Sequence, residues 1–215
     1  MDNKLLSSFP DLEILLISDK PFHYVSGGIG PYYIDLRRGC NDPEIFKIIL
    51  KKYLELLPDK DATFVGVPTT GVVYATGLAL TCETNLGIIE KLNPERIHVF
   101  SYQTLNQELN NYEKYIKEKN CAFLGLEDMG VMFATGLGMR LNKPSAILRR
   151  IQKGHGTSKT VEANLNKFKK NGIDTLYIIN DPYNPLEESE IMTTLKSIPD
   201  SDGFNFIILN QTKLM

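Results

Sequence analysis

Residues 64–80, FVGVPTTGVVYATGLAL, are typical of a short buried strand that turns into a helix. Gly66 and Pro68 interrupt the apolar run, and the small residues after Gly71 are typical of a helix that packs tightly on a sheet. Residues 123–139, FLGLEDMGVMFATGLGM, align with this stretch without a gap at an offset of 59 residues. Two strand–helix units that converged on one packing would explain the match, but an internal duplication explains its gapless form more directly.

The same alternation of strand and helix continues on both sides of these units. Strands are predicted over 62–68, 95–101, 121–126, 144–150, 173–181 and 204–210, and helices over 43–57, 71–80, 106–119, 160–172 and 187–198. Strands that alternate with helices indicate an α/β fold, with a mainly parallel sheet and helices on both faces.

Composition limits the classes of function. The chain has 215 residues, of which 42% are hydrophobic, enough for one large domain or for one domain with a small extension. The formal net charge of −2 and the pI near 6.0 argue against a general nucleic-acid or membrane-surface binder. Any positively charged site must therefore be local.

The cysteines and the apolar runs indicate a soluble protein of a reducing compartment. Cys40, Cys82 and Cys121 are odd in number and far apart, so they predict neither a disulfide framework nor a zinc site, and we expect them to pack as small hydrophobic residues. No signal-peptide pattern opens the chain, and no apolar run approaches the roughly 20 residues of a membrane helix. We expect a cytoplasmic protein.

Residues 146–165, AILRRIQKGHGTSKTVEANL, concentrate positive charge in a segment where two glycines disfavour a stable helix. Arginine recognises phosphate with two parallel hydrogen bonds, lysine offers a point charge, and histidine exchanges a proton near neutral pH. Arg149, Arg150, Lys153 and His155 therefore suggest the capture of a polyanion such as a diphosphate. The alternative is an ordinary solvated charged loop.

Three collinear stretches resemble orotate phosphoribosyltransferase, a member of the type I phosphoribosyltransferase family. FHYVSGGIGPYYIDLRR (22–38) is similar to the family's N-terminal signature, and GVPTTGVVYAT (66–76) is similar to its pyrophosphate-side loop. The basic segment resembles the family's catalytic loop and the Val-Glu helix that follows it. The three stretches comprise about a fifth of the chain and occur in the family's order.

The resemblance implies a type I phosphoribosyltransferase-like fold, with a small N-terminal hood over 1–40 and an α/β core over 41–215 that contains the duplication. It implies the transfer of ribose 5-phosphate from phosphoribosyl pyrophosphate to a pyrimidine-like base, with Mg²⁺, in pyrimidine nucleotide biosynthesis. It also implies a homodimer in which the basic loop reaches the neighbouring subunit's site. No nucleic-acid or membrane partner is expected.

By the same resemblance, particular side chains take particular roles. Lys153 and His155 would contact the pyrophosphate, Asp181 the ribose, and Tyr32 or Tyr33 the base. The predicted catalytic residues are Lys153, His155, Arg150 and Asp181, and the predicted substrate-binding residues are Ser26, Gly27, Tyr32, Tyr33, Thr69, Thr70, Arg149 and Asn180. No residue is predicted to ligate a metal directly.

The sequence departs from the family where phosphoribosyl pyrophosphate should bind. The family has two acids there, followed by a loop rich in hydroxyls and glycine whose amides and helix start cradle the 5-phosphate. In LYIINDPYNPLEES (176–189), Asn180 replaces the first acid and Pro185 removes an amide donor. Glu187 and Glu188 bring negative charge to the start of the helix, although acids at such a start also stabilise ordinary helices.

Base recognition departs as well. The family usually has lysine at Val25 and at Arg150, and an Asp-Arg pair where this chain has Asn210 and Gln211. The duplication leaves open which copy lines the site. GVPTTG (66–71) has the hydroxyls, whereas GLEDMG (125–130) belongs to the unit that directly precedes the basic segment.

Two hypotheses follow from these departures. The chain is either a working phosphoribosyltransferase or a non-catalytic relative that serves as a binding, regulatory or partner subunit. A working enzyme requires backbone amides within 180–189 that are free to face a phosphate. A non-catalytic relative predicts a loop that its own side chains fill.

Overall fold

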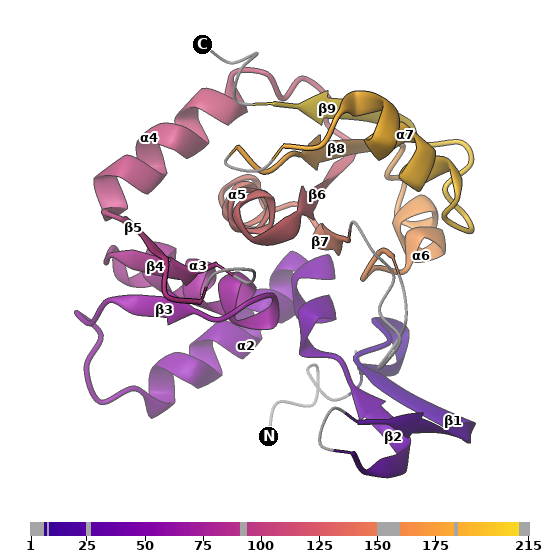
Figure 1. Cartoon of the computed structure of the whole chain (residues 1–215), viewed down its shortest axis with the longest axis horizontal. Coiled ribbons are helices and arrows are strands. Elements are labelled where there is room, and N and C mark those ends of the chain that lie inside the picture. Colours follow the sequence, from indigo (N-terminus) through magenta and orange to yellow (C-terminus); the bar gives the residue numbers. More distant parts are fainter. Residues whose placement is uncertain are drawn as a thin grey trace.

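The strands of the core form two separate sheets (Figure 1). The computed structural model describes residues 7, 9–24, 27–90, 94–149, 160–182 and 185–210. One sheet is wholly parallel, in the order β7 (Ser145–Leu148), β6 (Cys121–Leu126), β8 (Thr175–Ile179) and β9 (Asn205–Leu209). In the other, β3 (Phe64–Gly66) pairs in parallel with β4 (Leu86–Ile89), which pairs antiparallel with β5 (Ile97–Phe100). The predicted α/β class is confirmed.

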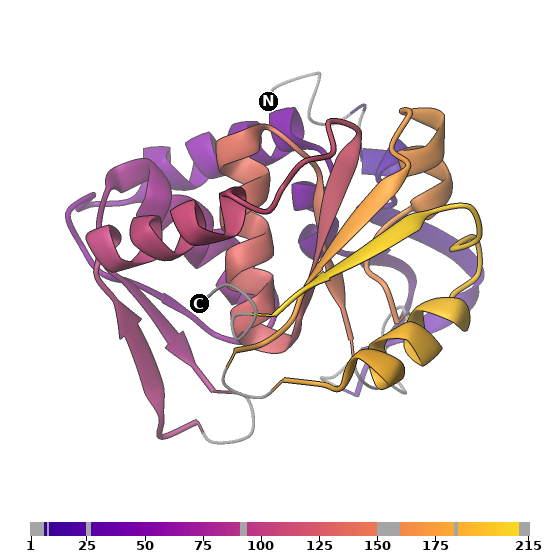
Figure 2. The same cartoon turned by 90° about the horizontal axis from the view of Figure 1, so that it is seen from above.

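The four-stranded sheet carries helices on both faces, as predicted (Figure 2). Because side chains alternate along a strand, Phe123 and Tyr177 face one core with α5 (Glu127–Leu141), whereas Leu124 and Ile178 face another. α6 (Leu165–Lys170) and α7 (Glu188–Lys196) supply Phe168, Ile191 and Leu195 to that second core.

Four helices fill the space between the two sheets. α3 (Thr70–Cys82) packs on β3 and on α5, α2 (Pro43–Leu56) packs on α3, and α4 (Tyr102–Glu113) packs on α5. One apolar cluster includes residues of all four helices and of both sheets. The two sheets therefore share a single core and do not belong to independent halves.

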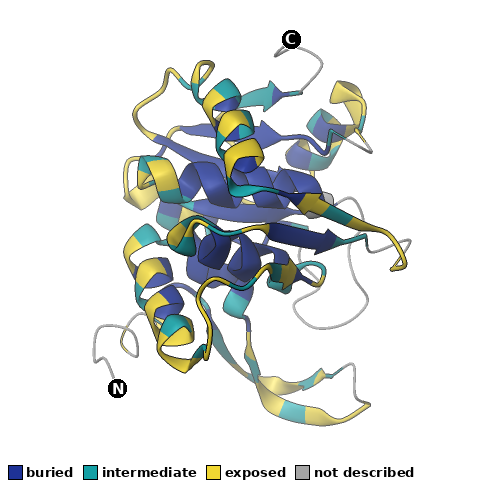
Figure 3. Ribbon diagram, turned by 90° about the vertical axis from the view of Figure 1, so that its left-hand side faces the viewer, coloured by how far each residue is buried: buried dark blue, intermediate teal, exposed yellow. Residues whose placement is uncertain are grey.

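A two-stranded antiparallel hairpin projects from this body (Figures 1 and 3). It consists of β1 (Leu15–His23) and β2 (Ile29–Ile34), and the 3₁₀ helix η1 (Leu36–Asn41) leads from it into the core. The hairpin lies within the segment expected to be a hood, although the sequence did not reveal its strands. The division of domains at residue 40 stays a prediction.

The structural repeat extends well beyond the stretch that the sequence aligns. The elements α2, β3, α3 and β4 recur in the same order as α4, β6, α5 and β7, again 59 residues later. The register is the same in both, since Phe64 pairs with Leu86 and Phe123 pairs with Ser145. We call residues 42–90 the first copy and residues 101–149 the second copy.

Details of the helix ends and rings repeat as well. The residues that cap α3 and α5 at their C-termini, Glu83 and Asn142, are both left-handed, with φ of 58° and 52°. Equivalent aromatic pairs join the two helices of each copy: the ring centroids of Tyr53 and Tyr74 lie 5.2 Å apart, and those of Tyr112 and Phe133 lie 5.0 Å apart. The two units therefore repeat in structure down to their helix ends and rings, and their origin by internal duplication stays a prediction.

Some boundaries differ from the sequence predictions. The helix predicted over 160–172 begins only at Leu165, because Val161 pairs with Leu148 and the Asn164 side chain accepts the Lys167 amide at 3.0 Å. The helix predicted to continue to 119 ends at Glu113. Within the described part of the chain, no helix has the length and apolarity needed to cross a membrane.

Candidate functional site

The predicted site lies at the carboxyl ends of the parallel strands β7 and β8, where open α/β sheets bind ligands. Arg149 directly follows β7, and Asn180 and Asp181 directly follow β8. Four of the predicted site residues fall outside the described residues: Ser26, Arg150, Lys153 and His155.

Asn180 closes the loop that follows β8. Its side chain is buried, and its Oδ1 accepts hydrogen bonds from the amides of Asp181 (3.0 Å) and Leu186 (3.1 Å). Its Nδ2 donates to the Leu186 carbonyl at 2.8 Å, and its own amide donates to the Leu209 carbonyl at 3.2 Å. One amide side chain thus satisfies both ends of the loop. An aspartate could not, because it lacks the Nδ2 donor.

The backbone amides at the start of α7 also have hydrogen-bond acceptors within the helix itself. The Glu187 amide donates to Glu190 Oε2 at 3.4 Å, and the Glu190 amide donates to the Glu187 carbonyl at 3.0 Å. Glu188 adds a second acid to the first turn and accepts Asn210 Nδ2 at 3.4 Å. These carboxylates interact favourably with the positive end of the helix dipole, which is the place a phosphate dianion would take.

Asp181 is a buried acid whose charge acts on Tyr112. It is 6% exposed. Burial raises the pKa of the Tyr112 hydroxyl, and the charges of Glu108 and Asp181 raise it further. Asp181 supplies one carboxylate and the Asn180 oxygen already accepts two bonds, so this pair does not fit Mg²⁺, which requires several oxygen ligands. Among the described residues, no group of three or more His, Cys, Asp or Glu side chains could hold a metal.

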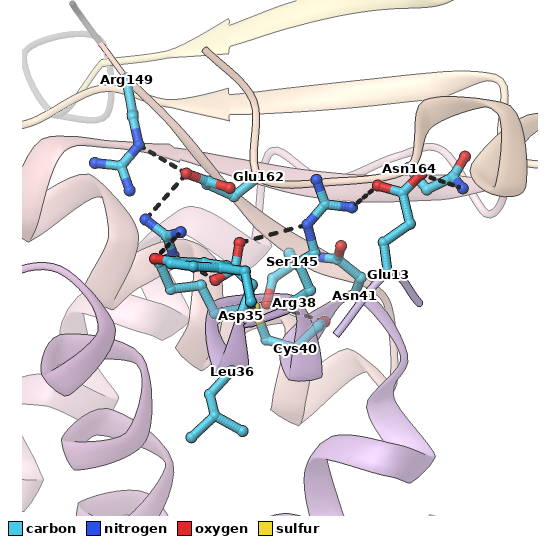
Figure 4. Close-up of polar contacts among 12 residues, drawn as sticks. Glu13, Asp35, Leu36, Arg38, Cys40, Asn41, Ser145, Arg149, Glu162 and Asn164 are labelled. Atoms are coloured by element: carbon cyan, nitrogen blue, oxygen red, sulfur yellow. Dashed lines mark hydrogen bonds and ion pairs between the residues drawn. The ribbon is translucent and has the colours of Figure 1, made fainter. Parts of the chain in front are cut away.

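Arg149 is held in a buried ion-pair network (Figure 4). The guanidinium is 6% exposed, and its Nε donates to Glu162 Oε1 at 3.0 Å. Arg37 Nη1 lies 3.0 Å from the same Glu162 oxygen, and Arg37 Nε donates to Asp35 at 2.5 Å. Arg37 Nη2 also reaches the Tyr33 hydroxyl at 3.4 Å. Two predicted site residues, Tyr33 and Arg149, are therefore linked through Arg37 and Glu162.

The network continues from the core toward α6. Arg38 is fully buried, pairs with Glu13, and lies 3.5 Å from Asp35. Glu13 also accepts Asn164 Nδ2 at 3.3 Å, next to the start of α6 (Figure 4). The network therefore joins the base of the hairpin to the strand and the helix on either side of the basic segment.

Burial and neighbouring charge set the protonation of this network. Burial lowers the pKa of Arg37, but the hydrogen bond and charge of Asp35 and the charge of Glu162 outweigh it, so the net shift is upward. Burial, with the charge of Asp35, raises the pKa of Glu162 against the opposing charges of Arg37 and Arg149. Nη2 of Arg149 is buried and has no hydrogen-bond partner among the described residues. One donor of Arg149 is thus uncommitted, although Glu162 fixes its Nε.

The remaining predicted residues lie elsewhere. Thr69 and Thr70 follow β3 in the other sheet, at the start of α3. Tyr32 is 54% exposed on the hairpin, and Gly27 has a left-handed φ of 85° in the turn between its strands. They therefore lie on other elements than Asn180 and Asp181, which follow β8.

Sequence reasoning missed the acids and arginines that hold the network. Asp35, Arg37 and Arg38 lie in the stretch YYIDLRR, and Glu162 lies in TVEANL, both of which were quoted only for their resemblance to family motifs. The available signal was the presence of charged residues among strand-like apolar ones, since buried charges are almost always paired.

Comparison with known proteins identifies the same relatives as the sequence motifs. The orotate phosphoribosyltransferase of Sulfolobus acidocaldarius is 24% identical over 159 residues, which are 74% of this chain and 50% of that protein. Over these residues the chain is similar in sequence to an orotate phosphoribosyltransferase. The enzyme of the same name from Pyrobaculum islandicum is 38% identical over 71 residues, 33% of this chain and 37% of that protein. The chain thus spans half the length of the first relative and less of the second, and no protein-family model matches it.

Two solved structures are also similar to the chain, and one of them is an orotate phosphoribosyltransferase. The orotate phosphoribosyltransferase of Aeropyrum pernix gives a TM-score of 0.38 at 16% identity, over 98% of this chain and 95% of that one. The UMP synthase of Leishmania donovani gives a TM-score of 0.39 at 15% identity, over 91% of this chain and 38% of that one. Scores below 0.5 do not establish a shared overall arrangement.

Proposed function

We propose that this chain is a non-catalytic relative of the orotate phosphoribosyltransferases, which serves as a binding or partner subunit. The observation that carries the proposal is the bonding of Asn180, whose side chain accepts the amides of Asp181 and Leu186 and donates to the Leu186 carbonyl. These are groups of the loop that a transferase would offer to the 5-phosphate of its substrate.

Electrostatics at the same loop support the proposal. Glu187, Glu188 and Glu190 stand at the N-terminus of α7, where a transferase would place the phosphate. Two unit charges of like sign about 4 Å apart repel by about 1 kcal/mol in water, and by more where water is excluded. A phosphate dianion would therefore have to displace hydrogen bonds and approach carboxylates at once.

A working transferase of the orotate type is the second candidate, and the sequence relationship favours it. In that case Lys153 and His155 would bind the pyrophosphate, Asp181 the ribose, and Tyr32 or Tyr33 the base. Ser26, Thr69 and Thr70 would complete the substrate contacts, and Mg²⁺ would arrive with the substrate. A homodimer in the cytoplasm belongs to this candidate as well.

Calorimetric titration with phosphoribosyl pyrophosphate and Mg²⁺ separates the two candidates. The proposal predicts no heat of binding at about 1 mM ligand, which would correspond to a binding free energy weaker than about −4 kcal/mol. An orotate phosphoribosyltransferase assayed in parallel controls for the ligand. A saturating heat would overturn the proposal, and orotate consumption followed by ultraviolet absorbance would then identify the base.

Lys153→Ala tests whether the basic segment binds the pyrophosphate, as the second candidate requires. If the ligand binds, removing this cation should weaken binding at least tenfold, or by about 1.4 kcal/mol. Lys51→Ala, on the exposed surface of α2, is a control of equal charge change. Unchanged affinity of Lys153→Ala would mean that the basic segment does not contact the pyrophosphate.

A further inference from the structure

A cavity of about 1010 Å³ lies between α6, the connection from α7 to β9, and the segment that precedes β1. Its described walls include neither Arg149 nor Asn180 and Asp181, so it is distinct from the candidate site at the carboxyl ends of the strands. Cavities of about 300–1,000 Å³ are the size that holds a small organic ligand in other proteins. The cavity therefore has room for a ligand of its own.

The buried residues that line the cavity are apolar. Val161, Ala163 and Leu165 are at most 8% exposed and belong to the apolar cluster that α6 and α7 share. The charged residues of the lining lie closer to solvent, since none of them is buried. An apolar lining with a few polar groups placed around it is the usual composition of a ligand pocket.

α6 supplies two uncommitted cations to this cavity. Lys167 and Lys170 are three residues apart, so they lie on the same face of the helix. Neither ammonium has an ion pair or a hydrogen bond with another described residue. Lys169 does not line the cavity, and its Nζ lies 5.1 Å from the centre of the Phe204 ring. Two cations of α6 are thus available to a ligand, whereas the lysine between them is engaged elsewhere.

Two other segments supply uncommitted acids. Asp11 precedes β1 and Asp200 lies in the connection between α7 and β9, and both are exposed. No ion pair joins either carboxylate to a cation of the described part of the chain. Glu13 also lines the cavity, but it pairs with Arg38 and accepts Asn164 Nδ2 at 3.3 Å, as Figure 4 shows. The described lining therefore offers a ligand two positive and two negative groups.

This balance of charge indicates which kind of ligand the cavity can hold. Two unit charges about 4 Å apart interact by about 1 kcal/mol in water, attractively or repulsively according to their signs. A polyanion would gain at the lysines but lose at the aspartates, and a polycation would do the reverse. A ligand with one negative and one positive end gains at both, because complementary charges fix the orientation of a bound molecule.

We propose that the cavity binds a short peptide as a zwitterion, with its carboxylate at Lys167 and Lys170 and its ammonium at Asp11 and Asp200. A free peptide carries these two charges at opposite ends, and its apolar side chains can cover the buried part of the lining. A free amino acid carries both charges on a single carbon and would fill only a small part of the cavity. The proposal goes beyond the function proposed above and does not depend on whether the loop after β8 binds a phosphate.

Titration of the isotope-labelled full chain with trialanine, followed through the amide resonances in NMR spectra, tests the proposal. The amides of α6 and of the connection after α7 should shift, and the shifts should saturate below about 10 mM peptide, because exposed charge contacts are weak. Acetylation removes the ammonium of trialanine, and amidation removes its carboxylate. Each modification should weaken binding about threefold or more. Alanine is the control for length and should also bind more weakly than trialanine.

Two pairs of variants test the contacts at the two ends of the peptide. Lys170→Gln should weaken trialanine binding about twofold or more, whereas Lys169→Gln, on the same helix but outside the cavity, should not. Asp200→Asn should also weaken binding, because asparagine removes the charge and tolerates the left-handed φ of 65° there, and Asp202→Asn is its control. Three outcomes would each overturn the proposal: no saturable shift with trialanine, a blocked peptide or alanine that binds as tightly, and equal effects of Lys169→Gln and Lys170→Gln.

Discussion

Glu162 illustrates how single residues organise this molecule. Its carboxylate, 1% exposed, receives Arg37 and Arg149 at 3.0 Å each, and it thereby joins η1 to the end of β7. Removing one partner of a buried ion pair leaves the other charge buried without compensation, which costs about 3–5 kcal/mol. Glu162 therefore stabilises the fold and also fixes the orientation of the Arg149 side chain.

We expect Glu162→Gln to lower the free energy of unfolding by about 3 kcal/mol, the low end of that range. The low end applies because burial already raises the pKa of Glu162 and so offsets part of its attraction to the arginines. Urea denaturation measures the change. Glu55→Gln, which breaks an exposed pair with Lys52 at 2.7 Å, should change stability by less than about 1 kcal/mol. Equal effects of the two variants would contradict this account of the network.

The three thiols should differ in reactivity. Cys40 and Cys121 are buried, whereas Cys82 is half-buried near the end of α3. Burial raises the pKa of Cys40 to about 12 and so disfavours the reactive thiolate. A thiol reagent at pH 8 should modify one cysteine in the native protein and three after unfolding, and Cys82→Ser should abolish the native reaction. Rapid modification of a second thiol in the native protein would contradict the burial of Cys40 and Cys121.

At the scale of elements, both strand–helix units depend on a glycine. A Cβ placed on Gly66 would lie 2.8 Å from Val72 Cα, and one placed on Gly125 would lie 2.4 Å from Val131 Cα. These are backbone atoms, which cannot move aside as a flexible side chain can. Each glycine therefore sets how closely its helix approaches its strand.

Gly66→Ala and Gly125→Ala should each destabilise the protein by about 1–3 kcal/mol, the usual cost of overpacking, with the larger loss at the tighter Gly125 site. Thermal unfolding measures which variant is the less stable. Gly71→Ala is the control, because its new methyl would meet its nearest neighbour at 3.6 Å and because alanine favours the helix. A Gly71→Ala variant less stable than Gly125→Ala would contradict the duplicated packing.

The elements show where sequence reasoning succeeds and where it stops. α2, a long periodic segment, was predicted nearly to its ends, because its apolar spacing is set by the core it enters. β8 was found as a continuous apolar run, with two residues too many at each end. β4 was missed although its counterpart β7 was found, since LGII is short and carries a glycine. The helix at 160–172 was predicted too long, because the pairing of Val161 with Leu148 is a tertiary contact.

The candidate site was predictable in its parts but not in its bonding. Composition of the loop indicated that Asn180, Pro185 and Glu187 depart from a phosphate cradle. That Asn180 bonds both ends of the loop, and that Glu162 holds Arg149, depends on which segments the fold brings together. Spacing along the chain carries no such information.

At the scale of the whole molecule, the two copies share one apolar core. Leu50 and Val72 of the first copy belong to the same cluster as Leu109 and Val131 of the second. Separating the copies would expose both sides of the contact between α3 and α5, so neither should unfold alone. Hydrogen exchange should give similar opening free energies for β4 and β6. Complete exchange of β4 while β6 stays protected would show that the copies are independent units.

The central claim is that the loop after β8 is filled by its own side chains, and the Leu186 amide reports on it most directly. Hydrogen exchange at this amide, measured with and without about 1 mM phosphoribosyl pyrophosphate and Mg²⁺, tests whether the hydrogen bond to Asn180 already occupies it. Because Asn180 Oδ1 accepts this amide at 3.1 Å, exchange should be slow in the free protein and unchanged by the ligand. Fast exchange in the free protein that slows when the ligand is added would contradict the claim.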